Sequence, residues 1–157
     1  TLTTPIQLAL ATAKLINQNY ILHPKLLKKD TISMHINSYK ENSRKNTNLK
    51  LVKDAMSLVT KEGGTAAFIG RNSSYNMSAK TGTAQVFGLK KDEVYDESKL
   101  PDKLKDHALF IAFAPTEEPR LVIAIVVENG GHGGSTAGPI AKKVFDAYLS
   151  GVKQWAI

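Results

Sequence analysis

The chain has 157 residues and a formal net charge of +7, with 42% hydrophobic and 22% charged residues. This length and composition favour one globular unit with a single core over a disordered chain. Because cysteine is absent, disulfide frameworks, thiolate metal sites and cysteine nucleophiles are excluded. No purely apolar run is longer than Leu121–Val127, far below the roughly 18 residues of a membrane span. The first five residues lack a basic and an apolar region, so we expect no signal peptide there.

Positive charge is concentrated in residues 1–61, which contain ten Lys or Arg and three Asp or Glu, whereas residues 62–157 are neutral. Such a basic region could bind nucleic acid or another anionic surface. The alternative is a solvated, lysine-rich surface, which we favour because no aromatic platform accompanies the lysines. We therefore expect no nucleic-acid partner.

The N-terminal residues predict an amphipathic helix. Thr4 is a favourable N-cap, and Pro5 suits the first helical position. Apolar residues then recur at helical spacing as far as Ile16, and residues 17–19 are expected to end the helix.

The next part of the chain predicts a short strand and a second helix. Residues 20–31 indicate connecting chain, Thr31–Asn37 alternates like a strand, and the polar residues 38–48 indicate a loop. Apolar residues between Leu51 and Val59 predict a helix, which we expect Gly63 and Gly64 to end.

The second half of the chain predicts strands. Lys80–Phe87 has the composition of a short strand. Residues 90–106 contain 11 charged side chains and indicate a solvent-exposed loop. Ala108–Ala114 and Leu121–Val127 predict an antiparallel hairpin in the middle of a sheet, joined by a turn at residues 115–119.

A glycine-rich loop, residues 130–134, precedes a last helix that we expect Ser135 or Thr136 to cap and Gly151 to end. Two helices, three strands and one helix predict an α/β (α+β) fold. Its antiparallel sheet would have at least three strands, with flanking helices.

The segment Lys80-Thr81-Gly82-Thr83 offers chemistry at the start of a predicted strand. Lys80 supplies a cation that can hydrogen-bond catalytic hydroxyls, and Gly82 permits close backbone approach. Thr81 and Thr83 add hydroxyls, and the Thr83 N–H could donate to an oxyanion. The free edge of such a strand could also pair with an extended peptide. An ordinary strand with a surface lysine and a bulge glycine is the alternative interpretation.

The K-T-G triplet is the third motif of β-lactamases and penicillin-binding proteins. Its surroundings resemble one family along nearly the whole chain, namely the C-terminal part of the transpeptidase domain of class B penicillin-binding proteins. The elongation-type penicillin-binding protein 2 group is the most similar. The matching segments are Thr4–Ala9, Lys80–Val86, Asp106–Pro115, Val126–Gly134 and Pro139–Ala141.

The resemblance implies a partial β-lactamase/transpeptidase-like fold and a peptidoglycan DD-transpeptidase that cross-links D-Ala-D-Ala stem peptides through an acyl-serine. It implies that Lys80 and Thr83 are catalytic, and that Thr81, Gly82, Thr83 and Gln85 bind substrate. No cofactor is implied. The implied partners are the stem peptide, β-lactam antibiotics and the cell-elongation machinery. The implied location is the periplasmic face of the bacterial inner membrane, with an anchor upstream.

The family's S-x-x-K nucleophile motif and its S-x-N motif precede the helix that begins with T-P, and would lie upstream of Thr1. Ser150–Lys153 and Ser74–Asn76 match these patterns, but at positions that do not suit the chemistry. We therefore expect residues 1–157 to be the C-terminal portion of the domain, inactive in isolation. A non-catalytic peptide-binding α/β module that uses an edge strand is the alternative.

Two further expectations concern metals and association. His23 and His35 lack partners at ligand spacing, so no metal is expected, and His107 and His132 are interpreted as structural or conformational residues.

In the family fold, upstream strands pair beside the strand that matches Leu121–Val127. Without them the exposed edge predicts self-association through residues 121–127, unless Thr31–Asn37 covers it.

Overall fold

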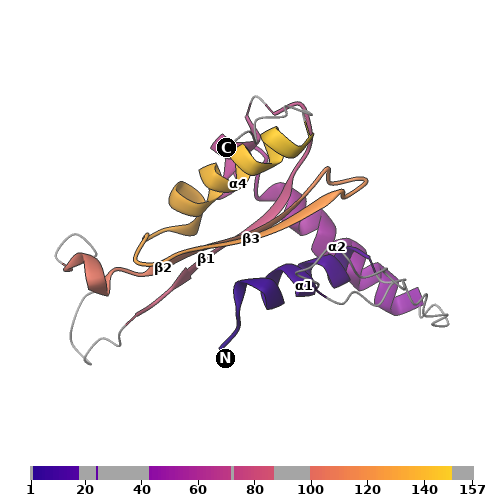
Figure 1. The fold of residues 1–157 in the computed structure, drawn as a ribbon. Coiled ribbons are helices and arrows are strands. Elements are labelled where there is room, and N and C mark those ends of the chain that lie inside the picture. Colours follow the sequence, from indigo (N-terminus) through magenta and orange to yellow (C-terminus); the bar gives the residue numbers. More distant parts are fainter. Residues whose placement is uncertain (1, 18–23, 25–42, 72, 87–99, 150–157) are drawn as a thin grey trace, which may run out of the picture.

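The computed structural model describes residues 2–17, 24, 43–71, 73–86 and 100–149 (Figure 1). The elements are α1 (Pro5–Ile16), α2 (Ser43–Leu58), α3 (Ala67–Gly70), β1 (Ser78–Ala84), the 3-10 helix η2 (Asp102–Leu104), β2 (His107–Ala114), β3 (Leu121–Val127) and α4 (Gly133–Leu149). None of the helices in these ranges is long and apolar enough to cross a membrane.

The three strands form an antiparallel sheet in the order β1-β2-β3. Ser78 lies opposite Phe113 and Ala84 lies opposite His107, so β1 pairs with nearly the whole of β2. The predicted hairpin of β2 and β3 is confirmed, with Ala108 opposite Val127. Within the described residues, however, β3 is the last strand of the sheet rather than a central one.

Helices cover both faces of this sheet (Figure 1). α4 lies across one face and contacts all three strands, while α1 packs on the opposite face against β2 and β3. α2 contacts β1 and α1. The predicted class, an antiparallel sheet of at least three strands with flanking helices, is therefore confirmed.

The core lies between α4 and the sheet. Phe110 and Phe145 are fully buried there, and the small residues Ala137 and Ala141 allow α4 to approach the strands closely. Alternate residues of β3 pack against this core, because side chains of a strand point in turn to its two faces.

The N-terminal helix forms as expected. The Thr4 hydroxyl accepts a hydrogen bond from the Gln7 N–H, and the Gln7 side chain accepts one from the Thr4 N–H, which makes a capping box. Asn17 is the C-cap, as predicted.

Several boundaries differ from the predictions. β1 begins at Ser78 rather than Lys80, because Ser78 and Ala79 are buried against β2. Residues 43–48 belong to α2 rather than to a loop, since a helix that is already held by packing on β1 and α1 extends at little cost into neighbouring residues. α3, a single turn, was not predicted.

The last helix begins earlier than expected, at Gly133. The hydroxyls of Ser135 and Thr136 donate to the carbonyl oxygens of His132 and Gly130, so neither residue is the predicted N-cap. The predicted strand at residues 31–37 and the predicted helix end at Gly151 lie outside the described residues.

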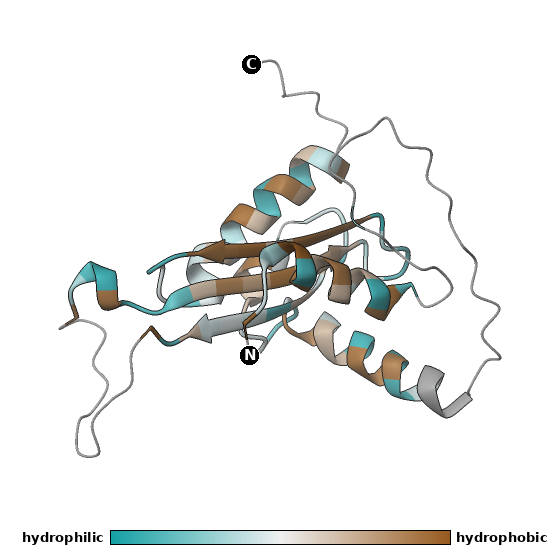
Figure 2. Ribbon diagram, turned by 60° about the horizontal axis from the view of Figure 1, so that its bottom comes forward, coloured by the Kyte–Doolittle hydropathy of each residue, from teal (hydrophilic) through white to brown (hydrophobic). Residues whose placement is uncertain are grey.

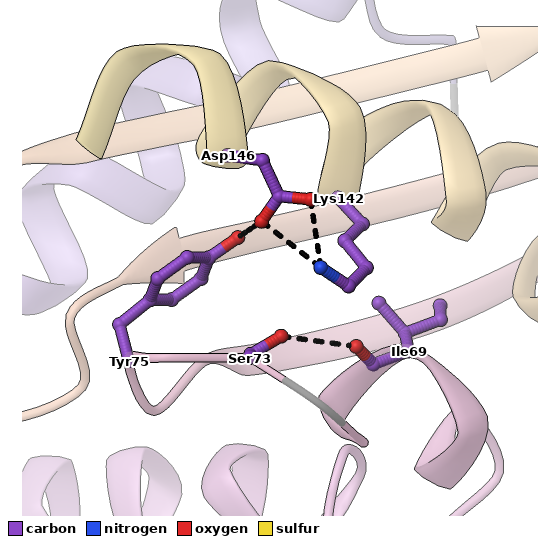
Figure 3. A network of polar contacts seen from close by, with 5 residues as sticks. All are labelled: Ile69, Ser73, Tyr75, Lys142 and Asp146. Atoms are coloured by element: carbon purple, nitrogen blue, oxygen red, sulfur yellow. Dashed lines mark hydrogen bonds and ion pairs between the residues drawn. The ribbon is translucent and has the colours of Figure 1, made fainter. Parts of the chain in front are cut away.

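A polar contact joins α4 to the segment that enters β1 (Figure 3). The Tyr75 hydroxyl donates to Asp146 at 2.7 Å, and the Lys142 ammonium donates to both oxygens of the same carboxylate, at 2.7 and 2.9 Å. Burial, together with the hydrogen bond to Asp146, raises the pKa of Tyr75 above its ordinary value of 10.0. Burial alone would raise the pKa of Asp146, but Lys142 and Tyr75 hold it below its ordinary value.

We predict that Tyr75→Phe lowers the free energy of unfolding at neutral pH by about 1.5 kcal/mol, the usual contribution of a hydrogen bond to a charged group. Because the folded chain retains the phenol proton more tightly, this contribution is intact below pH 10 and declines as the pH rises further. Urea unfolding at several pH values should show the difference between wild type and variant narrowing above pH 10.

The matched control is Tyr148→Phe, because Tyr148 is an exposed tyrosine of α4. It should leave stability unchanged across the same pH range. A Tyr75→Phe difference that stays constant through the alkaline range would contradict the proposed cause.

Candidate active site

The four residues of the K-T-G-T segment lie on β1, at the end of the sheet. No strand in the described part of the chain pairs with the second edge of β1. Lys80 and Thr83 are exposed, whereas Thr81 and Gly82 are half-buried. Since side chains alternate along a strand, Thr81 and Thr83 share the α4 face, and Lys80 lies on the face covered elsewhere by α1. Gln85 is exposed just beyond the end of β1.

Lys80 presents its ammonium group at this open edge. Its Nζ donates to the carbonyl oxygen of Thr81 at 2.5 Å, so the side chain curls along the strand. No carboxylate among the described residues forms an ion pair with it. The cation is therefore available to hydroxyl or carboxylate groups that approach this edge.

The start of α4 lies directly on the backbone of the sheet beside Gly82. A Cβ at Gly133 would lie 2.1 Å from the Leu109 carbonyl oxygen and 2.4 Å from that of Gly82. A Cβ at Gly82 would lie 3.2 Å from the Cβ of Leu109. Only glycine at position 133 permits this approach, which fixes the height of the α4 N-terminus above β1.

Thr81 meets a residue that the sequence analysis did not select. The Thr81 and Thr65 hydroxyl oxygens lie 3.5 Å apart, and either could be the donor. A Cβ at Gly134 would lie 3.1 Å from the Thr65 carbonyl oxygen and 3.4 Å from Cγ2 of Thr81. The sequence identified Gly63 and Gly64 as a helix end, but no local pattern indicated that the next residue reaches β1.

The opposite end of β1 is held by two other segments, the turn after α2 and the turn between β2 and β3. The Thr60 hydroxyl donates to the Met77 carbonyl oxygen, and the Thr116 N–H donates to that of Asn76 at 2.9 Å. The hydroxyls of Ser78 and Thr116 lie 2.9 Å apart. β1 is thus anchored at its beginning, while the K-T-G-T end remains accessible.

The glycine loop before α4 is positioned by the chain that leads into β2. The Asn129 N–H donates to Nδ1 of His107 at 2.9 Å, and the Gly131 N–H donates to the Asp106 carbonyl oxygen at 2.8 Å. The Asn129 amide also donates to the carbonyl oxygens of Lys103 and Lys105. The structural interpretation of His107 is therefore confirmed.

Two segments match the family's S-x-N and S-x-x-K patterns at unsuitable positions, and the structure describes only the first of them. In Ser74–Asn76, the Tyr75 hydroxyl is bonded to Asp146, and the Asn76 amide donates to Glu117 at 3.0 Å. Ser150–Lys153 lies outside the described residues. Within the described ranges, no group of three or more His, Asp or Glu residues could hold a metal ion.

Comparison with known proteins agrees with this arrangement. The family model described as penicillin binding protein transpeptidase domain matches residues 1–146. The peptidoglycan D,D-transpeptidase MrdA of Haemophilus influenzae is 36% identical over 94% of this chain and 24% of its own length, and that of Acinetobacter baumannii is 37% identical over 93% and 22%. The chain thus spans about a quarter of the length of these relatives.

Solved structures show the same likeness. PBP2 of Pseudomonas aeruginosa, in complex with WCK 5153, matches 98% of this chain and 31% of its own, with 30% identity and a TM-score of 0.66. PBP2 of Helicobacter pylori, in complex with MreC, matches 95% of this chain and 25% of its own, with 26% identity and a TM-score of 0.74. The edge strand with its K-T-G-T segment is therefore part of a known domain, and the chain belongs to the penicillin-binding protein transpeptidase family.

Proposed function

We propose that residues 1–157 are the C-terminal portion of a peptidoglycan D,D-transpeptidase domain of the elongation type, and that the catalytic serine lies upstream of Thr1. The observation that supports this most directly is the K-T-G-T segment on an open edge strand in a member of this family. The identity to enzymes named as peptidoglycan D,D-transpeptidases supports the same activity.

In the proposed reaction, the serine oxygen attacks the carbonyl carbon between the two D-alanines of a stem peptide. The terminal D-Ala leaves with a proton on its amine, and an acyl-serine remains. An amine of a second stem peptide then attacks the acyl carbon and displaces the serine oxygen, which regains a proton. β-Lactams would acylate the same serine, because their ring amide takes the place of the peptide bond.

Residues of β1 would serve this reaction from the open edge. The Lys80 ammonium, which has no ion-pair partner among the described residues, would stabilise the hydroxyls that exchange protons with the serine. The Thr83 N–H would donate to the oxyanion. Thr81 and Thr83, which share one face of the strand, would hold the substrate carboxylate, with Gly82 giving clearance and Gln85 extending the contact.

The partners follow from the same proposal. The substrate would be a stem peptide ending in D-Ala-D-Ala, and β-lactam antibiotics would bind the same site. Because a similar protein, PBP2 of H. pylori, forms a complex with MreC, we propose that the whole protein also works with the cell-elongation machinery. Its site of action would be the periplasmic face of the inner membrane.

A non-catalytic peptide-binding α/β module is the second candidate. The feature that favours it is the unpaired edge of β1, which could add an extended peptide as a further strand without any chemistry. The two candidates differ in whether a covalent acyl-protein forms.

Labelling with a fluorescent penicillin separates them. We expect no covalent label on the 157-residue chain, because the proposed catalytic serine lies upstream of it. We expect stoichiometric label on the protein that includes the upstream segment, at a serine outside residues 1–157. Mass spectrometry of the labelled peptide identifies that serine. Absence of label on the longer protein would favour the binding module, and label on Ser74 or Ser150 would contradict the assignment of the nucleophile.

Lys80→Ala in the longer protein should lower the rate of penicillin acylation by about a hundredfold or more, the range measured for loss of one preorganised hydrogen-bond donor in an active site. The fold should persist because the Lys80 side chain is exposed. Stopped-flow or gel-based labelling gives the rate. Lys143→Ala, an exposed lysine of α4, is the matched control and should acylate normally. A wild-type rate in Lys80→Ala would remove this lysine from the mechanism.

We further propose that the isolated chain self-associates through β3. Its second edge has no paired strand among the described residues, and the strand is hydrophobic along its whole length (Figure 2). A cavity of about 430 Å³ lies beside it, lined in part by Ala13, Ile16 and Val122. Size-exclusion chromatography with light scattering should show a mass that rises with concentration. A clean monomer at high concentration would indicate that another segment, such as Thr31–Asn37, covers the edge.

A further inference from the structure

We propose that Thr65 is an additional substrate-binding residue, whose hydroxyl joins those of Thr81 and Thr83 in recognising the terminal carboxylate of the peptide substrate. This inference rests on the proposed function, because it extends the same site. Thr65 belongs to the turn between α2 and α3, outside the K-T-G-T segment. It is exposed, and its hydroxyl lies beside that of Thr81 on the α4 face of the sheet.

The hydrogen bond between Thr65 and Thr81 leaves one hydroxyl proton without an acceptor among the described residues. Each threonine hydroxyl has one proton, and a single bond between Thr65 and Thr81 uses only one of the two. Among the described residues, neither hydroxyl has a second hydrogen-bond partner. The separation of 3.5 Å is also well beyond the roughly 2.7–2.8 Å typical of hydroxyl pairs. An acceptor oxygen placed between the two hydroxyls could therefore bond to both.

The backbone segments that carry the two hydroxyls are held in place by close packing. Gly134 lies against the Thr65 carbonyl oxygen and Cγ2 of Thr81, so the first turn of α4 sits beside both residues. Gly133 holds that turn on the backbone of Gly82. The backbone that carries the pair is thus preorganised, which reduces the entropy cost of binding a ligand there.

The charges around the pair favour an anion as its ligand. The N-terminal end of α4 has partial positive charge, and the first turn of this helix contains no acidic residue. Thr83, two residues beyond Thr81, adds a third hydroxyl on the same face of β1. Three hydroxyl donors beside a helix N-terminus suit a carboxylate, which has two oxygens and accepts several hydrogen bonds.

The test compares two ligands that differ only at the recognised group, an N-acylated D-Ala-D-Ala dipeptide and its C-terminal amide. Their dissociation constants are measured by NMR titration of the isotope-labelled 157-residue chain, an assay that needs no catalytic serine and is run at a concentration where light scattering shows a monomer. Wild type should bind the acid more tightly than the amide. Thr65→Val should weaken binding of the acid about tenfold, as for loss of one hydrogen bond to a charged group, and leave the amide unchanged.

Two further variants separate recognition from structure. Thr65→Ser keeps the hydroxyl and should retain the preference for the acid. Thr116→Val is the matched control, because it removes a hydroxyl that contacts a β1 hydroxyl, that of Ser78, at the opposite end of the strand. It should leave the preference unchanged. If Thr65→Val loses its dispersed spectrum, Thr65→Ala replaces it at this exposed position.

The proposal is overturned if the wild-type chain does not distinguish acid from amide, or if Thr65→Val weakens both ligands equally or neither. If the proposed function itself is wrong, the result is different: penicillin does not acylate the longer protein. Acylation with an unchanged acid preference in Thr65→Val would remove Thr65 and leave the transpeptidase assignment intact.

Discussion

The contact between the first turn of α4 and the backbone of β1 and β2 is the constraint on which the site depends. Gly133 lies so close to the carbonyl oxygens of Leu109 and Gly82 that any side chain would displace the helix. The same approach brings Gly134 against Thr65 and Thr81. A helix that must also bury Phe145 farther along the sheet therefore has little freedom to tilt, and the K-T-G-T end of β1 keeps a fixed surface beneath it.

The two ends of β1 differ in burial: the first residues are packed and hydrogen-bonded, and the last are exposed or half-buried. Its beginning is buried and bonded to the turn after α2, to the turn between β2 and β3, and through Tyr75 to α4. Its far end exposes Lys80 and Thr83 along an unpaired edge. A strand that is fixed at one end can present backbone and side-chain groups at the other without a large loss of entropy when a peptide binds.

The site uses the two faces of one strand for separate purposes. Lys80 lies on one face, while Thr81, Thr83 and Thr65 gather on the other, beside the α4 N-terminus. Alternation of side chains along β1 thus separates the cation proposed to act on the serine from the hydroxyls proposed to bind the carboxylate. Were both groups on one face, the ammonium would pair with the substrate carboxylate and would be less available to the serine.

Local sequence determined much of the molecule. The capping residues of α1, the hairpin of β2 and β3 and the strand that bears K-T-G-T were all predictable, because periodicity and turn chemistry act over a few residues. The family, too, followed from motifs within short segments. The boundaries were less certain: β1 gained Ser78 and Ala79 because β2 offered a buried partner, and α2 extended into polar residues that local preferences assigned to a loop.

What only the tertiary structure decided are the contacts between segments far apart in the chain. Tyr75 bonds Asp146 across 71 positions, and Thr65 reaches Thr81 across 16. Neither pair has a sequence signature, since each depends on how α4 packs on the sheet. The glycines at 133 and 134 were visible as a loop, but their purpose, a close approach of helix to strand, appears only when the backbones are placed together. Spacing along the chain identifies the residues that can do chemistry, and packing across the chain decides which of them meet.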